Sequence, residues 1–493
     1  MKPFNYRPFV LCGLSAAAGV VSSAFTSVRS PFIPLIIPLA LAIAAIVGFA
    51  VSKRREILFH SVIYVLIFCV CSLQITRLID LNLAAPFYDG EVAVTGTVKD
   101  VMTYSSATDR TFVVIGDLSS DGSDLAGSAT ANADGKVEIG DRVFIRGTAE
   151  KVDYSNIDVY MFPSGVFYNF KNVSESAVLS TGSGFFYGVR TGLKGILYEN
   201  CTAKTFPFAL ALLTGETIGT DYLSFANFRA AGISHIFAVS GLHIGFIAAL
   251  ASLIMRLLGV RRLKNAVAVL VVTLLYSGVC GFPVSAIRAT IICFVYGAAR
   301  SLGRKPDPLN AVFLSMTIVL TLFPNSLFSL GFLLSFAAVV GIATLKSGLR
   351  SALGFMNAKV SEAFAVTISA FLFTAPIIAC ISGSVSLVTI LSNFLFLPLA
   401  SAVYYVLIAC AVVTAAFPFM SSVFVVANGL ISFITDAVDL VSFERFLIYG
   451  EMTKALAAFY YGTLVLSSDK INVGSGVRRA FACAASLSLI LFI

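Results

Sequence analysis

Long apolar runs dominate the pattern of hydrophobic and polar positions in the first part of the chain. Three of them occupy residues 8–28, 31–52 and 57–79. Each is long enough to cross a hydrocarbon core of about 30 Å. We therefore predict three N-terminal transmembrane helices within residues 1–80. The first run lacks a convincing cleavage site and is followed at once by another, so we expect an uncleaved helix.

The period of the pattern changes between residues 81 and 180. Polar and apolar residues alternate at 92–98, 110–115 and 142–147, residues 158–170 are aromatic and strand-like, and Gly and Asp mark the turns. Such alternation is typical of half-buried strands. We predict a small external β-domain of about five strands, an OB-type barrel by its size, with an unrelated small sandwich as the alternative.

A mixed, amphipathic connector at residues 181–227 follows and is expected to lie on the outer face. Its short apolar stretch at 203–215 is expected to re-enter the membrane.

Residues 228–493 form a second membrane region. Its expected spans are 240–258, 265–281, 285–301, 309–323, 327–345 and 362–381. Beyond residue 385 the spans are harder to delimit, because Asn393 and Pro398 interrupt one run and Pro418 separates another. The predicted fold is a polytopic α-helical membrane protein of about 10–13 helices, some broken or re-entrant.

Composition supports this fold class. The chain is 58% hydrophobic and 12% charged, with a mean hydropathy of +0.92. Soluble domains carry about 25% charged residues, so an ordinary soluble protein is excluded. The nine cysteines lie mostly inside apolar runs, which suggests neither a disulfide framework nor a CxxC metal site.

The distribution of charge predicts the orientation. Lys2 and Arg7 precede the first run and residues 53–55 are all basic, whereas the first connection carries only Arg29. The positive-inside rule then places the N-terminus in the cytoplasm and the β-domain outside, in a multi-pass protein of the bacterial plasma (inner) membrane. Basic clusters at 256–264, 300–305 and 346–359 mark further cytoplasmic loops.

Polar residues enter the apolar core most densely at residues 228–243, FRAAGISHIFAVSGLH. The segment places Arg229, His235, Ser240, Gly241 and His243 at or inside a membrane boundary. Irregular backbone at membrane depth is tolerated only where it is buried in protein or lines a water-filled cavity. We therefore expect this segment to line a cavity.

Three further polar side chains interrupt later spans, namely Arg288, Ser335 and Asn393. At 1.5 Å per residue, His243, Arg288 and Ser335 each lie about 16–20 Å from the basic end of their own helix. They can therefore share one layer in the outer half of the bilayer and form a polar vestibule. The alternatives are that Arg288 snorkels to the surface and that Ser335 makes a small-residue helix contact.

Several of these polar segments resemble those of a known protein family. Segment 228–243, with its Val-Ser-Gly-Leu-His element, is similar to the competence DNA-internalisation channel family, ComEC. Tyr276-Ser277-Gly278, Asp307-Pro308 and the block at 331–336 follow in the order that the family shows. The resemblance is strongest over residues 205–400, and it extends to the layout of residues 1–180.

The resemblance implies that one DNA strand passes inward through the membrane core during natural transformation. Its expected partners are single-stranded DNA, a DNA-delivering competence receptor outside and a cytoplasmic helicase-like ATPase. The chain has no GxxxxGK[ST] loop of its own, which agrees with a separate motor. The expected DNA path comprises Arg229, His235, Ser240, Gly241, His243, Arg288, Ser335 and Asn393.

Longer family members end in a metallo-β-lactamase-like domain. His60, His235 and His243 are the only histidines here and cannot supply an HxHxDH metal site. We therefore expect a form without that domain, neither an enzyme nor a metal or cofactor binder. Two alternatives stay open: the nuclease is a separate protein, or the chain is a truncated copy.

The β-domain holds 14 of the 26 acids but only 7 of the 34 Lys and Arg residues, which argues against strong DNA binding by the whole domain. A local patch of cations remains a candidate external DNA contact: Lys99, Arg110, Arg142, Arg146 and Lys151, with Phe112, Tyr154 or Tyr160 for stacking. A structural or docking role is the alternative.

Two other functions compete with the DNA channel. Broken helices with midplane polar residues also fit a secondary transporter of a small anion. Ser240 with His235 or His243 could form the dyad of an intramembrane serine protease, although such a pair normally joins two elements.

Overall fold

A computed structural model describes residues 8–26, 55–88, 90–105, 108–120, 122–154, 161–216, 222–237, 239–386, 388–441, 447–449 and 453–467. The chain divides into two compact units. The barrel unit comprises Pro8–Gly192 and Ile247–Phe332. The C-terminal unit comprises Leu193–Phe246 and Leu333–Ile493, together with Met1–Arg7.

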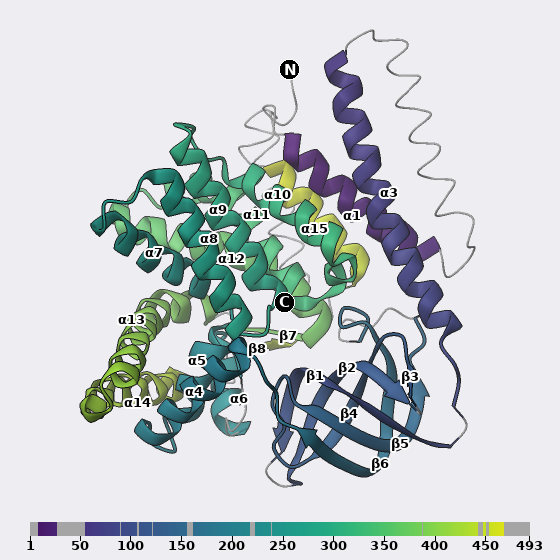
Figure 1. Cartoon of the computed structure of the whole chain (residues 1–493). Helices are drawn as coiled ribbons and strands as arrows, with labels where there is room; N and C mark the ends of the chain where they lie inside the picture. The colour runs from purple at the N-terminus through teal and green to yellow at the C-terminus, as the bar shows by residue number, and fades with distance from the viewer. Residues whose placement is uncertain are drawn as a thin grey trace. The chain divides into compact units, whose positions relative to one another are not determined.

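The N-terminal helices of the barrel unit are α1 (Pro8–Thr26) and α3 (Arg55–Ala84). They pack against each other and against α10 (Pro308–Leu322) (Figure 1). The hydroxyls of Ser23 and Ser72 meet between α1 and α3, so both are satisfied inside apolar surroundings. The expected helices at 8–28 and 57–79 are therefore present, and the expected span 31–52 lies outside the described residues.

The β-domain is a closed five-stranded barrel, as predicted. Its main strands are β1 (Glu91–Ser105), β2 (Arg110–Ser120), β4 (Ser128–Asp134), β5 (Arg142–Lys151) and β6 (Val166–Ser180). The order β1-β5-β6-β4-β2 closes through pairing of β1 with β2, and a short β3 (Ser123–Asp124) extends β2 (Figure 1). All these neighbours are antiparallel except β4 and β6, which run parallel.

The barrel core explains which strands the sequence could predict. Val113, Ile115, Val143 and Ile145 alternate inward and are buried. Strand β4 reads SATANAD and carries no large apolar residue, so its pattern gave no strand signal. Within the described part of the expected strand at 158–170, Met161–Gly165 form a turn and β6 begins at Val166.

The remaining helices of this unit are α8 (Arg262–Val279), α9 (Val284–Ser301) and most of α7 (Gly241–Leu257). The barrel is tied to the helical part by specific contacts. The Asn325 side-chain amide donates to the Pro163 carbonyl at 2.6 Å, and the Phe162 and Phe328 rings meet edge to face. Arg190 on α4 (Phe185–Asn200) is buried and donates from Nε to the carbonyl of Val279, at 2.6 Å.

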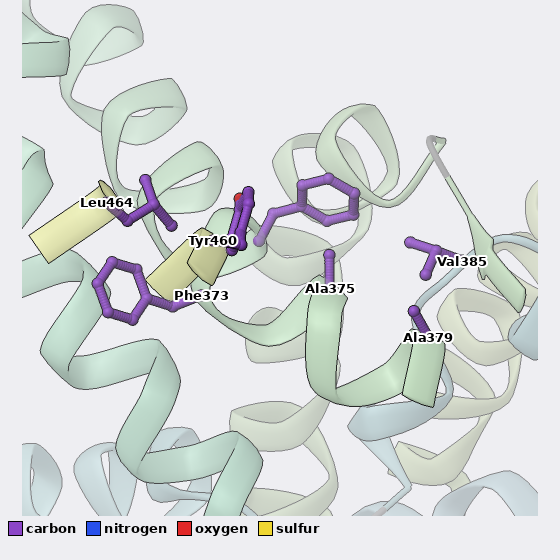
Figure 2. Close-up of a cluster of buried hydrophobic side chains, with 7 residues drawn as sticks. Phe373, Ala375, Ala379, Val385, Tyr460 and Leu464 are labelled. Carbon is purple, nitrogen blue, oxygen red and sulfur yellow. The ribbon is translucent and has the colours of Figure 1, made fainter. Parts of the chain in front are cut away.

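The C-terminal unit is mostly helical. Its elements are α5 (Phe206–Thr214), α6 (Tyr222–Ala230), η1 (Ser234–Ile236), most of α11 (Leu330–Ala352), α12 (Ala358–Ser382), α13 (Thr389–Ala416), η3 (Pro418–Val423), α14 (Phe424–Val441) and α15 (Lys454–Ser467). Two short strands, β7 (Ser384–Ser386) and β8 (Leu447–Tyr449), pair antiparallel. Figure 2 shows the core where α12 meets α15: Phe373, Tyr460 and Leu464 pack together, and Val385 of β7 belongs to the same cluster.

Helix α13 corrects one expectation. The sequence predicted an interruption at Asn393 and Pro398, but α13 runs through both as one helix of 28 residues. Proline removes one backbone donor, and membrane helices tolerate this where side chains and local adjustments satisfy the freed groups. The predicted break at Pro418 is present, because the 3-10 helix η3 separates α13 from α14.

Within the described residues, six helices are long and apolar enough to cross a membrane. They are Val62–Ala84, Arg262–Val279, Leu330–Ala352, Ala358–Ile381, Thr389–Ala416 and Pro418–Leu440. Helix α5 is short, and every residue from Phe208 to Thr214 is buried. The predicted class, a polytopic helical membrane protein with an inserted barrel, is confirmed.

Candidate functional site

The segment at 228–246 is the most irregular part of the C-terminal unit. Helix α6 ends at Ala230, and Gly232 adopts a φ of +72°, a left-handed conformation that favours glycine. Phe228 and Phe237 then fold onto Phe208 of α5, with ring centroids between 4.7 and 5.7 Å apart. The glycine turn and the aromatic cluster thus hold a non-helical stretch in front of α7.

Ser240 and His243 together cap the start of α7. The Leu242 N–H donates to the Ser240 hydroxyl oxygen at 3.2 Å, and the Ser240 N–H donates to His243 Nδ1 at 3.1 Å. This reciprocal pattern is a capping box in which histidine replaces the usual Glu or Gln. Because Nδ1 accepts the backbone proton, a neutral His243 carries its hydrogen on Nε2.

The same geometry weakens the protease alternative. Ser240 Oγ and His243 Nδ1 are 3.1 Å apart, which is within reach for a dyad. Both groups already serve the backbone of the helix start, however, and both come from one turn of chain. The contact is therefore explained by local helix capping without a catalytic role.

Segment 228–246 runs along α13. The Ser386 hydroxyl donates to the Ala230 carbonyl at 2.7 Å just before α13 begins, and Thr389 lies directly against Gly232. Further along, the His243 ring packs edge to face on Tyr404, with centroids 5.1 Å apart. Thr389 and Tyr404 are separated by 15 residues, or about 22 Å of helix. The segment and α13 are thus neighbours over most of a membrane thickness.

A polar turn of α13 lies inside this stretch. Ser392 is fully buried and Asn393 is half-buried. Within the described part of the chain, neither Ser392 Oγ nor Asn393 Oδ1 has a hydrogen-bond partner. A buried polar group without a partner costs about 1–3 kcal/mol, so native proteins usually satisfy it with protein, water or ligand. We therefore expect water or a bound polar molecule to hydrogen-bond to Ser392 and Asn393.

The structure brings some of the predicted path residues together. Ser240, Gly241 and His243 form one helix start, and Asn393 lies on the helix that flanks it. Arg229 and His235 are exposed on the same segment. Ser335 is half-buried on α11, and none of the described contacts joins it to the helix start, so its place in the path stays a prediction.

Arg288 belongs to the barrel unit and lies near the N-terminal end of α9. Only 3% of it is exposed, and Ala286, Ala289 and Thr290 beside it are also buried. The alternative of an arginine that snorkels to the surface therefore does not hold in this structure. Ionisable side chains inside membrane helices are rare and usually functional, so the position of Arg288 is a candidate functional one.

Sequence reasoning missed several polar side chains of this site. Tyr404 stands in an apolar run, and Ser386 lies on strand β7, whereas Ser392 was singled out together with Asn393. Aromatic and small hydroxyl residues are common in membrane proteins, so no local signal separated Tyr404 and Ser386 from ordinary packing residues.

Most of the cations that were candidate DNA contacts on the barrel already interact with other groups of the protein. Three cations form ion pairs: Lys99 with Asp117, Arg110 with Asp134 and Arg146 with Glu175, at 2.9–3.2 Å. Lys151 donates instead to the carbonyls of Leu83 and Ala85, between α3 and the barrel. Arg142 is exposed on β5.

The three aromatic residues that were expected to stack on DNA differ in their burial. Tyr154 is buried, packs on Phe162 and Phe167, and donates its hydroxyl to the Val166 carbonyl, so it is a core residue rather than a stacking platform. Phe112 is half-buried, and Tyr160 lies outside the described residues.

The described residues contain no group of three or more His, Cys, Asp or Glu side chains that could hold a metal ion. Eight of the nine cysteines lie among these residues, and they form no disulfides with one another.

Comparison with known proteins agrees with the position of this site. A sequence profile described as "Competence protein" matches residues 212–468, which is more than half of the chain and includes both segment 228–246 and α13. The chain belongs to the competence protein family. The earlier resemblance to the ComEC family is thereby confirmed.

Two curated relatives match as well. The chain is 24% identical to ComE operon protein 3 of Bacillus subtilis (strain 168) over 273 residues, and 33% identical to an uncharacterized protein of Aquifex aeolicus (strain VF5) over 174 residues. The matches cover 53% and 34% of this chain, but only 34% and 40% of the two relatives. No solved structure matches the chain.

Proposed function

We propose that this protein is the membrane channel through which single-stranded DNA enters the cytoplasm during natural transformation. Membership of the competence protein family supports a role in DNA uptake. The observation that carries the proposal further is the polar turn at Ser392 and Asn393, buried in an apolar helix and aligned with segment 228–246. Water or a passing nucleotide would supply the missing hydrogen-bond partners.

The path would work by weak contacts. Arg229 and His235 are exposed and would meet the phosphates first, at the outer mouth. Further in, Gly241 and the capped start of α7 offer a small, rigid wall, and Asn393 offers an amide to the bases. Conduction requires contacts that are favourable enough for entry but weak enough for release. Ser335 would add a further hydroxyl on α11.

Arg288 has a separate proposed role. A buried guanidinium near the external end of α9 would attract a phosphodiester and repel cations. Arginine suits this task because its planar donors match phosphate oxygens. The site requires no chemistry on the DNA, so the driving force would come from a cytoplasmic helicase-like ATPase.

The barrel is proposed to face outward and to dock a DNA-delivering receptor. Its net charge is negative and three of its five candidate cations are paired with acids, so DNA phosphates would have to displace those acids. A docking surface for a protein requires no such exchange. A separate nuclease would degrade the complementary strand.

The proposal is tested in a naturally transformable host whose own copy of the gene is deleted. The host is complemented with wild type, with Arg288→Gln or with Arg350→Gln, the last being a matched loss of one arginine at an exposed pair with Glu362. We expect Arg288→Gln to reduce nuclease-protected labelled DNA at least tenfold, with surface-bound DNA and protein amount unchanged, and Arg350→Gln to behave as wild type. Normal uptake by the complete deletion would refute the function. Normal uptake by Arg288→Gln alone would refute only the role of that arginine.

A further inference from the structure

A large cavity lies at the opposite end of the barrel-unit helices, away from Arg288 along α9. It has a volume of about 1240 Å³, is open to the surface, and is lined by the C-terminal half of α7, the first half of α8, the last turns of α9 and the loops that follow α7 and α9. All of its lining residues belong to the barrel unit. It exceeds the usual 300–1,000 Å³ of small-molecule pockets.

The rim of the cavity is strongly basic. Five cations line it: Arg256, Arg262, Arg300, Arg304 and Lys305. No acidic side chain is among the lining residues, and within the described residues none of the five forms an ion pair. Asp307 lies just beyond the rim, where its carboxylate accepts the Asn310 N–H and caps α10. The cavity therefore favours an anion.

Backbone geometry builds this rim. Helices α7 and α9 are each followed, two residues after their last helical residue, by a glycine with φ of +70°, Gly259 and Gly303. In each case the following N–H bonds back into the last turn, from Val260 to the Met255 carbonyl and from Arg304 to the Ala299 carbonyl, both at 2.9 Å. These left-handed ends fold the loops back over the helix ends. The uncapped N-terminus of α8, which begins at Arg262, adds its positive dipole end.

The interior of the cavity is apolar. Ala266 and Val269 of α8 line it together with Ile292 and Cys293 of α9, and Ala248 of α7 belongs to the small cluster beneath. On the adjoining surface of α7, Leu253, Leu257 and Leu258 are between 53% and 79% exposed. A cationic rim over an apolar interior suits an amphiphile with an anionic head group and a hydrocarbon body.

One polar group inside the cavity remains unsatisfied. Asn265 is 9% exposed and its Nδ2 donates to Ser252 Oγ at 3.2 Å, but Oδ1 has no partner among the described residues. An amide oxygen requires a donor, and a phosphate ester has none to give. A hydroxyl-bearing head group would satisfy Asn265 Oδ1 while its phosphate contacts the arginines.

We propose that this cavity binds an anionic glycerophospholipid whose head group carries a free hydroxyl, such as phosphatidylglycerol. The phosphate lies among the arginines of the rim, the head-group hydroxyl donates to Asn265 Oδ1, and the acyl chains leave along α7. The site lies on the side that the basic clusters assign to the cytoplasm. Nucleic acid is the weaker fit, because single strands bind through stacked aromatics and Tyr296 is the only aromatic residue lining the cavity.

The test uses the purified full-length chain in detergent and native mass spectrometry. The added probes are dioleoylphosphatidylglycerol, dioleoylphosphatidylcholine, inorganic phosphate and a single-stranded oligonucleotide. Arg300→Gln with Arg304→Gln removes two rim charges. Arg261→Gln with Lys264→Gln is the matched control, because both residues lie beside Arg262 but neither lines the cavity.

We expect one phosphatidylglycerol to be retained per chain, in preference to phosphatidylcholine and inorganic phosphate. Each cation near an anionic head group strengthens binding about fivefold, so the rim double variant should bind about 25-fold more weakly and the control within threefold of wild type. If the rim variant fails to fold, Arg256→Gln with Arg262→Gln gives the same comparison from the other side. Asn265→Leu removes the acceptor of the head-group hydroxyl and should therefore reduce the preference for phosphatidylglycerol over phosphatidylcholine, whose head group has no hydroxyl.

Three results would overturn the proposal. Equal loss in both double variants would mean general surface electrostatics and no built site. Binding of inorganic phosphate as tight as that of the lipid would remove the role of the apolar interior. Competition between the oligonucleotide and the lipid, sensitive to the rim variant alone, would assign the cavity to nucleic acid.

Discussion

The capping box at the start of α7 allows the roles of Ser240 and His243 to be separated by substitution. His243→Leu replaces the imidazole with an apolar side chain of similar size and removes Nδ1, so the Ser240 N–H loses its acceptor. His243→Gln retains a side-chain acceptor at the position where capping boxes normally have Glu or Gln. Both variants lose the edge-to-face contact with Tyr404.

The magnitudes follow from these contacts. An aromatic pair is worth about 0.5–1.5 kcal/mol beyond its area, and both variants lose it. An unsatisfied buried donor costs a further 1–3 kcal/mol, and because Ser240 is half-buried we take the lower end. His243→Leu should therefore destabilise the protein by about 1 kcal/mol more than His243→Gln, which is a factor of about five in the folding equilibrium.

The assay measures unfolding of the purified protein in detergent and labelled-DNA uptake per folded molecule in cells. We expect unfolding midpoints in the order wild type, His243→Gln, His243→Leu, with uptake by His243→Gln close to wild type. Adding Ser240→Ala should show coupling of at least about 0.5 kcal/mol with His243→Leu, because the two side chains share one network. Abolished uptake in a fully folded His243→Gln would refute the capping role and assign the imidazole itself to the function.

Three further predictions rest on other parts of the molecule. Gly232→Ala should sharply lower the amount of folded protein, because the left-handed φ costs about 1–2 kcal/mol and the new methyl meets Thr389. The matched control is Gly245→Ala, a helical position with open space, which should stabilise the protein by up to about 1 kcal/mol. Equal effects of the two variants in membrane expression assays would contradict this prediction. Burial, and secondarily Tyr88, raise the pKa of Tyr168 to about 12. Its neutral form therefore contributes stability that is complete below its ordinary pKa of about 10 and is lost as pH rises through 12. Unfolding midpoints measured from pH 9 to 12 should fall less steeply in Tyr168→Phe than in wild type, and identical slopes would contradict this. Arg110→Gln with Arg146→Gln should change surface-bound DNA less than twofold in a filter assay, because both arginines are paired with acids, whereas a tenfold loss would make the barrel a DNA receptor.

The fold followed from the sequence wherever one strong signal decided it. Long apolar runs identified the membrane helices, and alternation identified β1, β2 and β5. Strand β4 escaped because alanine fills its inward positions and its place depends on pairing with β2 and β6, which no local pattern encodes. The continuous helix through Pro398 escaped because proline breaks helices in water more reliably than in a packed membrane protein.

The site was predictable only in part for a similar reason. The density of polar residues at 228–243 singled out Ser240 and His243, but their capping box needs three-dimensional hydrogen bonds. Ser392 and Asn393 also stood out in the sequence, but Tyr404 of α13 became visible only when the structure placed that helix alongside the segment. The basic cavity likewise depends on two left-handed glycine ends that bring distant arginines together.

The central claim is that a DNA strand passes the polar turn of α13. A photoreactive benzophenone amino acid at Asn393 tests it most directly, with the same residue at Leu395 as the control, because Leu395 is 44% exposed on another face of the helix. Cells are illuminated during uptake of labelled DNA. The account predicts a cross-linked DNA adduct at position 393 and none at 395. Equal labelling at both positions, or no adduct at 393 while uptake proceeds, would contradict it.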